Sequence, residues 1–159
     1  MKKLLIACIC VLVFSCKSGS DAGEPMPAFE ILLPDGITHM NTSRIEEGHP
    51  IALMYFSPDC EHCQAETEGI IKNIDSLKSV RFFFVTNEDF EEMKVFGAHY
   101  GLEKYPNITF GRDDQFFMIR HFKGIFPPYL ILYDKNKRQK KIFNGQTSAS
   151  DLTAAVNQL

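Results

Sequence analysis

The stretch "PIALMYFSPDCEHCQAE", residues 50–66, joins a run of apolar residues to a pair of cysteines. The run from Pro50 to Phe56 is continuous and has the length of a buried strand. Cys60 and Cys63 follow it at once, three positions apart. Beyond the pair, apolar residues recur at helical spacing at Ile70, Ile74 and Leu77. The stretch therefore predicts a strand, a short loop and a helix, with the two cysteines where the helix starts.

The rest of the chain alternates between strand and helix patterns. Residues 80–86, "VRFFFVT", are apolar apart from one arginine, which predicts a strand buried on both faces of a parallel sheet. Further strands are predicted at 29–33, 37–40, 107–110, 129–134 and 138–144, and helices at 90–100, 115–122 and 148–159. This order predicts an α/β domain with a central mixed sheet flanked by helices and preceded by a β-hairpin.

The N-terminus "MKKLLIACICVLVFSC", residues 1–16, has two lysines, an apolar run and then Ser15 and Cys16. That layout is typical of a secretory signal peptide, and the apolar run is too short to span a bilayer comfortably. The ending "VFSC" resembles a bacterial lipobox, which implies that Cys16 is lipidated and holds the protein at a membrane. We therefore expect a signal peptide over 1–15, a flexible tether over 16–27 and one domain over 28–159.

Cysteine usage and charge narrow the possible functions. Of the five cysteines, Cys8 and Cys10 leave with the signal peptide and Cys16 is capped by lipid, so Cys60 and Cys63 are the thiols of the mature chain. No disulfide framework can form, and about 144 mature residues suffice for one domain with its own core. The mature chain carries 15 basic and 20 acidic residues without a basic cluster, so we expect no nucleic-acid partner.

The position of the pair suggests its chemistry. Cysteines three positions apart in the first turn of a helix lie close enough to form a disulfide. The helix N-terminus offers unpaired N–H groups and positive partial charge, which favour thiolate. Cys60, the more exposed, is predicted to be the nucleophile, and Cys63 to resolve the mixed disulfide. Neither role requires a cofactor.

Two other interpretations of the pair stay open, a metal site and an inert buried pair. A zinc site needs two more ligands, and the sequence has no second C-x-x-C or paired-histidine motif. His62, His99 and His121 are scattered, so no metal site is predicted.

Three segments resemble the TlpA/ResA-like group of membrane-tethered, thioredoxin-fold thiol–disulfide oxidoreductases. "MPAFEILLPDG" is similar to the group's opening hairpin, "IALMYFSPDCEHC" to its strand before W-C-x-x-C, and "PPYLILYDKNK" to its proline-containing segment. The resemblance spans residues 26–159. It implies a thioredoxin-like domain in the bacterial cell envelope, facing the periplasm or the cell surface. Its implied partners are protein thiol or disulfide clients and a membrane thiol–disulfide electron donor, with reduction as the favoured direction.

The resemblance also implies a cis-proline facing the cysteines. Asp134 lies six residues after Pro128, as in the family pattern, so Pro128 is favoured. Pro127 stays a second possibility, because Phe126 would then supply the apolar residue before the cis-proline. If Pro128 is cis, Pro127 takes the place whose backbone N–H pairs with a substrate strand, and proline has no N–H to donate.

The chain departs from the family pattern beside the cysteines. The usual tryptophan is replaced by Asp59, and the buried acid of thioredoxin would fall at Met54, so Glu61 or Asp59 would have to substitute for it. Glu61 resembles the C-E-P-C of ResA-type reductases, whereas His62 matches the histidine of oxidants such as DsbA. A histidine there stabilises the Cys60 thiolate, while the acids oppose it, so the dipeptide leaves the redox direction open.

Two alternative functions fit the same fold. A peroxiredoxin-like thiol peroxidase is one, but Leu53 stands where such enzymes carry proline, with Ser57 in place of threonine. A non-enzymatic copper- or metal-binding lipoprotein is the other, although the related copper chaperones use C-x-x-x-C and the spacing here is one residue shorter.

Overall fold

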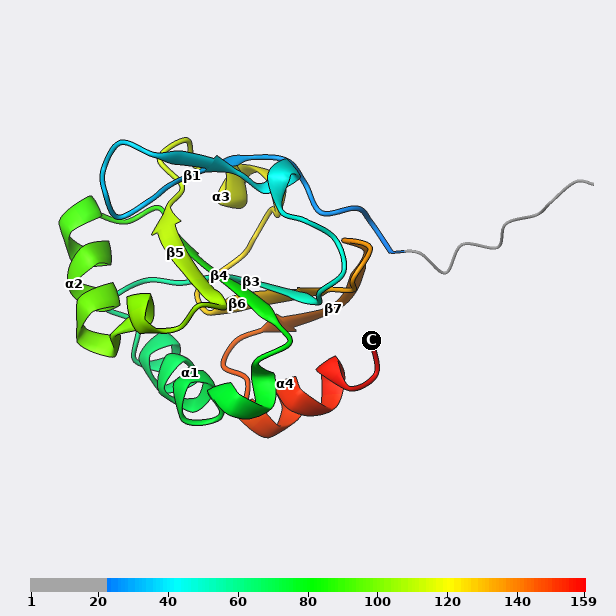
Figure 1. Ribbon diagram of the computed structural model, residues 1–159. Coiled ribbons are helices and arrows are strands. Elements are labelled where there is room, and N and C mark those ends of the chain that lie inside the picture. Colours follow the sequence, from blue (N-terminus) through cyan, green and yellow to red (C-terminus); the bar gives the residue numbers. More distant parts are fainter. Residues whose placement is uncertain (1–22) are drawn as a thin grey trace, which may run out of the picture.

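The computed structural model describes residues 23–159, so the predicted signal peptide, Cys16 and most of the predicted tether lie outside the described residues. The described chain forms a seven-stranded sheet in the order β2-β1-β5-β4-β3-β6-β7 (Figure 1). Its strands are β1 (Glu30–Leu32), β2 (His39–Asn41), β3 (Ile51–Tyr55), β4 (Arg81–Thr86), β5 (Ile108–Arg112), β6 (Tyr129–Tyr133) and β7 (Gln139–Asn144). The three strands β3, β4 and β5 are parallel and the other pairings are antiparallel, which confirms the predicted mixed sheet.

Helices cover both faces of the sheet. One face packs against α1 (Glu61–Lys72), α2 (Phe90–Tyr100) and α4 (Ala149–Val156) (Figure 1). The other lies under α3 (Phe117–His121), the short 3-10 helix η1 (Thr42–Arg44) and the β1–β2 hairpin. Two more 3-10 turns, η2 (Ile74–Leu77) and η3 (Leu102–Lys104), lead into β4 and β5.

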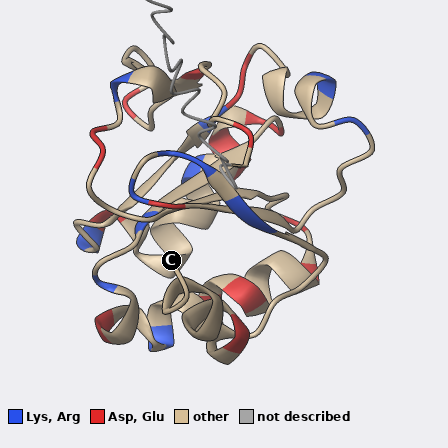
Figure 2. Cartoon of the chain, turned by 90° about the vertical axis from the view of Figure 1, so that its right-hand side faces the viewer, with Lys and Arg blue, Asp and Glu red and all other residues tan. Residues whose placement is uncertain are grey.

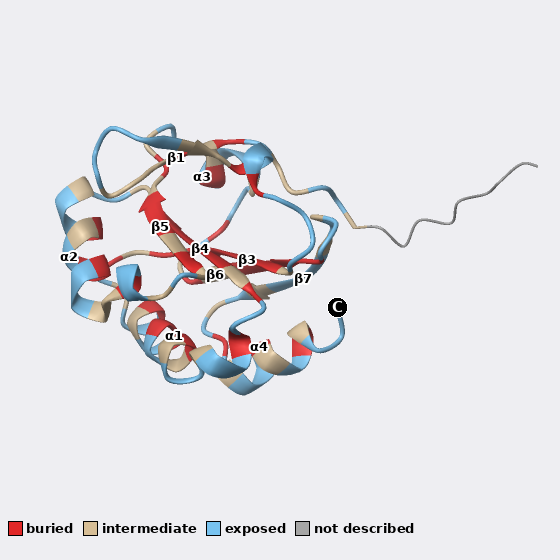
Figure 3. Cartoon of the chain, viewed as in Figure 1, coloured by how far each residue is buried: buried red, intermediate tan, exposed pale blue. Residues whose placement is uncertain are grey.

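The sheet separates two apolar cores, because successive side chains of a strand point to opposite faces. In β3, Ala52 and Met54 belong to the core under α1, α2 and α4, whereas Ile51, Leu53 and Tyr55 belong to the other. All five side chains are buried, as the unbroken apolar run predicts for a central strand (Figure 3).

The predicted N-terminal hairpin is confirmed. Its turn is closed by Asp35, whose carboxylate accepts hydrogen bonds from the backbone N–H groups of Ile37 and Thr38. Strand β1 then joins the main sheet next to β5, where Leu32 pairs with Arg112. The hairpin thus extends the sheet instead of standing apart from it.

The predicted helix ends agree with the structure in part: α4 ends at Val156 and not at residue 159, and α1 ends at Lys72, so that Ile74 and Leu77 belong to the separate turn η2. Helix α2 ends at Gly101, whose φ of 61° is a left-handed conformation that glycine adopts readily. Helix α4 is capped by Ser148, whose Oγ accepts the N–H of Asp151. Within residues 23–159, none of the helices is long and apolar enough to cross a membrane.

Candidate active site

The cysteine pair lies at the junction of β3 and α1, beyond the carboxyl ends of the parallel strands. Cys60 is the N-cap of α1 and is partly exposed, whereas Cys63, one turn further, is fully buried. The Sγ of Cys60 accepts a hydrogen bond from the backbone N–H of Cys63 at 3.4 Å. A sulfur in this position is bonded by one of the free N–H groups of the helix end and lies in its positive partial charge, and both favour a thiolate.

The proline segment lies against the cysteines although it is more than 60 residues away in sequence. The thiol of Cys60 donates a hydrogen bond to the carbonyl oxygen of Pro127 at 3.7 Å. The peptide bond between Pro127 and Pro128 is cis, and Pro128 is buried next to the partly exposed Pro127. Two motifs singled out in the sequence are thus brought together in space.

Cys63 is held in an environment that disfavours its charged form. Burial is the main cause that raises the pKa of the Cys63 thiol well above its ordinary value, and the neighbouring Cys60 and Glu66 raise it further. Cys63 therefore carries its proton until a reaction step removes it, which fits a resolving thiol better than an attacking one.

Glu66, which no motif in the sequence singles out, has the properties of a buried proton acceptor. It lies on α1 one turn after Cys63 and is only 3% exposed. Its Oε2 accepts the backbone N–H of Thr147 at 3.1 Å, while its Oε1 has no partner among the described residues. Burial raises the pKa of Glu66 to about 7, and the bond from Thr147 lowers it in part.

A helical pattern could have identified Glu66. The buried face of α1 consists of Cys63, Glu66, Thr67 and Ile70, which are three and four positions apart. A glutamate on the same face as a buried cysteine is the signal in the sequence. The three positions considered from the sequence for a buried acid do not supply one: Met54 is buried but not acidic, and Asp59 and Glu61 are exposed.

His62 is exposed and lies toward the chain that follows β7. Its Nδ1 is 2.8 Å from the amide oxygen of Gln146, so the ring donates this hydrogen bond. The structure therefore gives His62 a partner other than the Cys60 sulfur. Among residues 23–159, no three histidine, cysteine or acidic side chains are grouped so that they could hold a metal ion.

Two exposed features lie near Cys60 in the sequence or in contact with its neighbours. Phe126 is 73% exposed and directly precedes Pro127, whose carbonyl accepts the hydrogen bond from Cys60. A groove of about 430 Å³ lies between α2 and residues on either side of Cys60 in the chain. Pro58, Asp59 and Gln64 line one wall of this groove, and Val95, Phe96 and Tyr100 line the other.

Comparisons with known proteins find similarity at the level of structure. No protein-family model and no curated sequence matches the chain. A secreted Mycobacterium tuberculosis disulfide oxidoreductase, described as homologous to Escherichia coli DsbE, superposes with a TM-score of 0.69 at 20% identity, covering 82% of this chain and 96% of that one. A thioredoxin-like protein from Aeropyrum pernix gives 0.66 at 15% identity, with 83% and 89% covered.

A peroxidoxin, BcpB from Mycobacterium tuberculosis, superposes equally well, with a TM-score of 0.70 at 12% identity, covering 87% of this chain and 97% of that one. Both kinds of protein thus share the order of strands and helices described above. The chain has the thioredoxin-like fold, as the resemblance of its three motifs predicted.

Proposed function

We propose that this protein is a thiol–disulfide oxidoreductase that acts on protein thiols through Cys60 and Cys63. One observation carries the proposal: a partly exposed cysteine caps a helix with its sulfur beside the Pro127 carbonyl, and a second, buried cysteine lies one turn behind it. An inert pair has no need of the exposed position at the helix end, where the sulfur is reactive.

The two sulfurs carry out the exchange in two steps. The Cys60 thiolate attacks one sulfur of a client disulfide, forming a mixed disulfide and releasing the other client sulfur as a thiolate. Cys63 then loses its proton to Glu66 and attacks the Cys60 sulfur, releasing the second client thiolate. The client gains two electrons, and the Cys60–Cys63 disulfide holds the oxidised state until a thiol donor reduces it.

Reduction outside the cytoplasm is the direction we propose, with the chain anchored by lipid on Cys16. The signal-like N-terminus and its lipobox resemblance support an envelope lipoprotein, periplasm-facing or at the cell surface. An extracytoplasmic reductase needs electrons from elsewhere, for which a membrane thiol–disulfide relay is the proposed donor. Protein clients suit the exposed Phe126, which directly precedes Pro127, whose carbonyl contacts the reactive thiol.

The reduction potential of the Cys60–Cys63 couple tests direction and chemistry together. The chain from residue 16, with Cys16→Ser, is equilibrated against dithiothreitol or glutathione buffers. A value near about −270 mV supports a reductase, and one near about −120 to −180 mV makes the protein an oxidant or isomerase. The absence of a reversible couple contradicts exchange chemistry. It would make the binding of copper or another metal by the two thiols the favoured function.

A trapping experiment assigns the two roles. In Cys63→Ser, a client disulfide attacked by Cys60 stays attached, because no resolving thiol remains. The matched control Cys60→Ser keeps only the buried thiol and should trap nothing. Equal trapping by both variants contradicts the assigned order.

Peroxide reduction is the second candidate, favoured by the likeness to the peroxidoxin structure. Rapid turnover of hydrogen peroxide by the reduced chain, faster than its exchange with a peptide disulfide, would favour it.

A further inference from the structure

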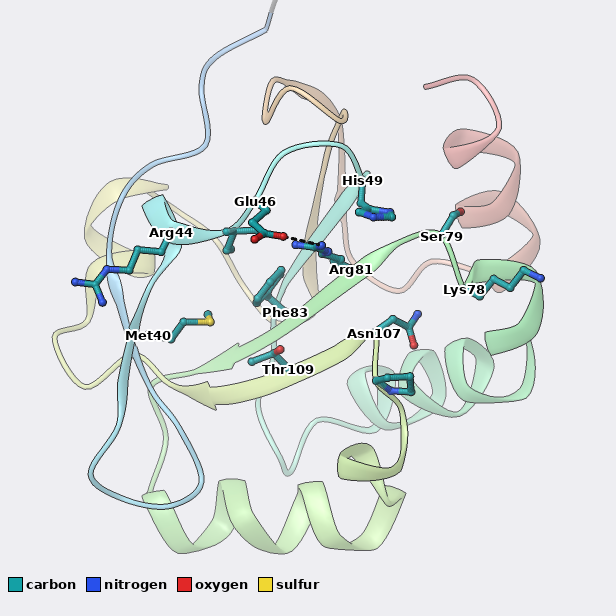
Figure 4. A pocket seen from close by; sticks show the side chains of 12 residues that line it. Met40, Arg44, Glu46, His49, Lys78, Ser79, Arg81, Phe83, Asn107 and Thr109 are labelled. Atoms are coloured by element: carbon teal, nitrogen blue, oxygen red, sulfur yellow. Dashed lines mark ion pairs between the residues drawn. The ribbon is translucent and has the colours of Figure 1, made fainter.

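A basic cavity lies at the end of the sheet remote from the cysteines. It has a volume of about 590 Å³ and is lined by the segment between β2 and β3, the turn before β4 and the first residues of β4 and β5 (Figure 4). The parallel strands β3, β4 and β5 all begin here, whereas Cys60 follows the far end of β3. Five strand residues at a rise of about 3.3 Å separate the two ends by roughly 17 Å.

The lining is positively charged although the whole chain has a formal net charge of −3. Three permanent cations, Arg44, Lys78 and Arg81, line it together with His49, against the single carboxylate of Glu46. Figure 4 shows Arg44 and Lys78 at opposite rims, with Arg81 and His49 between them. In the same view the charged ends of Arg44 and Lys78 point outward from the two rims, and Arg81 and His49 lie nearest the middle of the cavity. Arg81 is therefore the permanent cation best placed to contact an anion there, and the outer two raise the positive potential around it.

The ion pair within the cavity does not neutralise it. The guanidinium of Arg81 approaches a Glu46 oxygen at 3.6 Å, and the Glu46 side chain is 83% exposed. An exposed pair at this separation is weak. Among residues 23–159, the guanidinium of Arg81 donates no hydrogen bond, so its N–H groups stay free for a ligand oxygen.

The floor of the cavity mixes apolar and polar side chains. Phe83 and Met40 supply apolar surface (Figure 4). The polar side chains are Asn107, in the turn before β5, and Thr109, on β5. A small inorganic ion would use the cations alone. A phosphate with a short carbon-containing group attached would use both the cations and the floor.

The described chain begins near this cavity. The backbone N–H of Met26 donates to the carbonyl of Lys137, and the Nζ of Lys137 donates to the carbonyls of Ser43 and Ile45, on either side of Arg44. Gly23 lies against the backbone of Gln139 in the same region. From Cys16 to Gly23 the chain can span at most about 25 Å, even fully extended.

We propose that this cavity binds the phosphate of an anionic phospholipid headgroup and so fixes how the protein lies on its membrane. The orienting effect rests on the lipid anchor proposed above, because that anchor would hold Gly23, the start of the described chain, within about 25 Å of the bilayer. The headgroup contact turns the N-terminal ends of β3, β4 and β5 toward the lipid. Cys60, at the opposite end, then faces away from the membrane.

Vesicle binding by the unlipidated chain tests the site apart from the anchor. The chain from residue 16, with Cys16→Ser, should sediment with vesicles of phosphatidylglycerol and phosphatidylcholine, and much less with phosphatidylcholine alone. Each of Arg44→Gln and Arg81→Gln should weaken this binding about fivefold, the effect of one cation near an anionic surface. The matched control is Lys123→Gln, which removes an exposed charge four residues before Pro127, at the Cys60 end of the molecule, and should leave binding unchanged. Urea unfolding midpoints verify that each variant is folded.

Three results would overturn the proposal. Equal binding to both kinds of vesicle removes the role of the phosphate charge. An equal loss in the Lys123 control variant means diffuse attraction without a site. Binding of soluble glycerol 3-phosphate, in an Arg81-dependent way but without vesicle binding, assigns the cavity to a soluble phosphate compound instead. These outcomes are independent of the Cys60–Cys63 potential and of the mass of the lipidated chain, which test the proposed function and anchor separately.

Discussion

Glu66 keeps its carboxyl group almost completely out of water, and this makes the stability of the protein depend on pH. Burial raises its pKa from 4.5 to about 7, so between these values the folded protein holds a proton that the unfolded chain has lost. The stabilisation is complete below about pH 4.5, falls as the pH rises and levels off above about 7. By linkage the total loss is about 3 kcal/mol.

We expect Glu66→Gln to remove this pH dependence, because glutamine stays neutral and can still accept the N–H of Thr147. The variant should be more stable than the wild type at pH 8 by up to about 3 kcal/mol and nearly equal to it at pH 4.5. Urea unfolding at a series of pH values measures the difference. Parallel pH curves for the two proteins would show that Glu66 is not the group responsible.

The same substitution should slow the second step of exchange. Cys63 must lose its proton to attack, and a positioned base contributes about 100-fold or more to such a transfer. We expect Glu66→Gln to prolong the Cys60 mixed disulfide about 10- to 100-fold at pH 7, measured by acid quenching and mass spectrometry. The control Glu68→Gln changes an exposed acid of the same helix and should have no effect. An unchanged lifetime in the Glu66 variant would assign the proton to solvent.

At the scale of elements, the loop before β6 carries an exposed aromatic side chain next in sequence to the residue that contacts the reactive sulfur. Phe126 is exposed, and the residue after it accepts the hydrogen bond of Cys60. We expect Phe126→Ser to raise the KM for a peptide disulfide several-fold, because an exposed aromatic buries area against a partner at low entropic cost. Reduction of the small disulfide hydroxyethyl disulfide should not change.

The control for this loop is Ile37→Ser, since Ile37 is 82% exposed but lies on the β1–β2 turn. Three strands of the sheet separate β1 from β6, which places that turn about 19 Å to the side. Equal effects of the two substitutions on the peptide KM would mean that general surface hydrophobicity, and not the loop, binds the client.

The junction of the hairpin with the main sheet depends on Gly111. A Cβ at this position would lie 2.5 Å from the carbonyl oxygen of Leu32 and 2.6 Å from the Cγ2 of Ile31, so β1 could not approach β5. We expect Gly111→Ala to lower the free energy of unfolding by about 1–3 kcal/mol. Gly69→Ala, in helix α1 with its nearest contact at 3.9 Å, should instead raise it by up to about 1 kcal/mol. Urea unfolding of both variants measures these opposite signs.

The sequence predicts the strands and helices that have a local pattern. It does not predict contacts between residues that are distant in the chain. The buried strands β3 and β4 and the end of α2 at Gly101 follow from apolar runs and a single glycine. Strand β5 was predicted only as far as Phe110, yet it continues to Arg112 and lies between β1 and β4. That position follows from the close approach at Gly111, which no local pattern reveals.

The candidate site shows the same division. The cysteine pair and the proline pair each have a recognisable motif, so both could be selected from the sequence. The role of Glu66 depends on its burial and on its bond to Thr147, 81 residues away, and neither is visible in a run of residues. The contact between His62 and Gln146 is equally non-local, so the sequence could not decide whether the histidine serves the sulfur.

At the scale of the whole molecule, the sheet has two ends of different character. The carboxyl ends of the parallel strands carry Cys60, and their amino ends carry the basic cavity. The turn of the β6–β7 hairpin carries three further cations, Lys135, Lys137 and Arg138. Figure 2 shows basic residues gathered on the side of the molecule that it turns toward the viewer. Attraction of these groups to an anionic surface and exposure of Cys60 to clients therefore do not compete for the same part of the molecule.

This separation predicts that anchoring and exchange can be uncoupled. Among residues 23–159, the members of both apolar cores lie between Met26 and Val156. We expect Cys16→Ser to move the protein from the membrane fraction to the soluble fraction once membranes are washed in high salt. Salt screens the headgroup contact proposed above, and stable anchoring requires acyl chains, in which each buried methylene contributes about 0.8 kcal/mol. The exchange rate with a soluble peptide disulfide should stay within about twofold of the wild type, because stable sites that share no contacts act independently.

Cell fractionation, intact mass and the exchange rate together check this expectation. A wild-type chain that is soluble, with a free thiol at Cys16, contradicts the anchor and leaves the redox proposal standing. A soluble Cys16→Ser variant that has lost exchange activity contradicts the separation itself, because the reactive end would then depend on the lipid. Reduced exchange only with clients held at the membrane is consistent with it, since the anchor raises the concentration of the protein near such clients without changing the chemistry of Cys60.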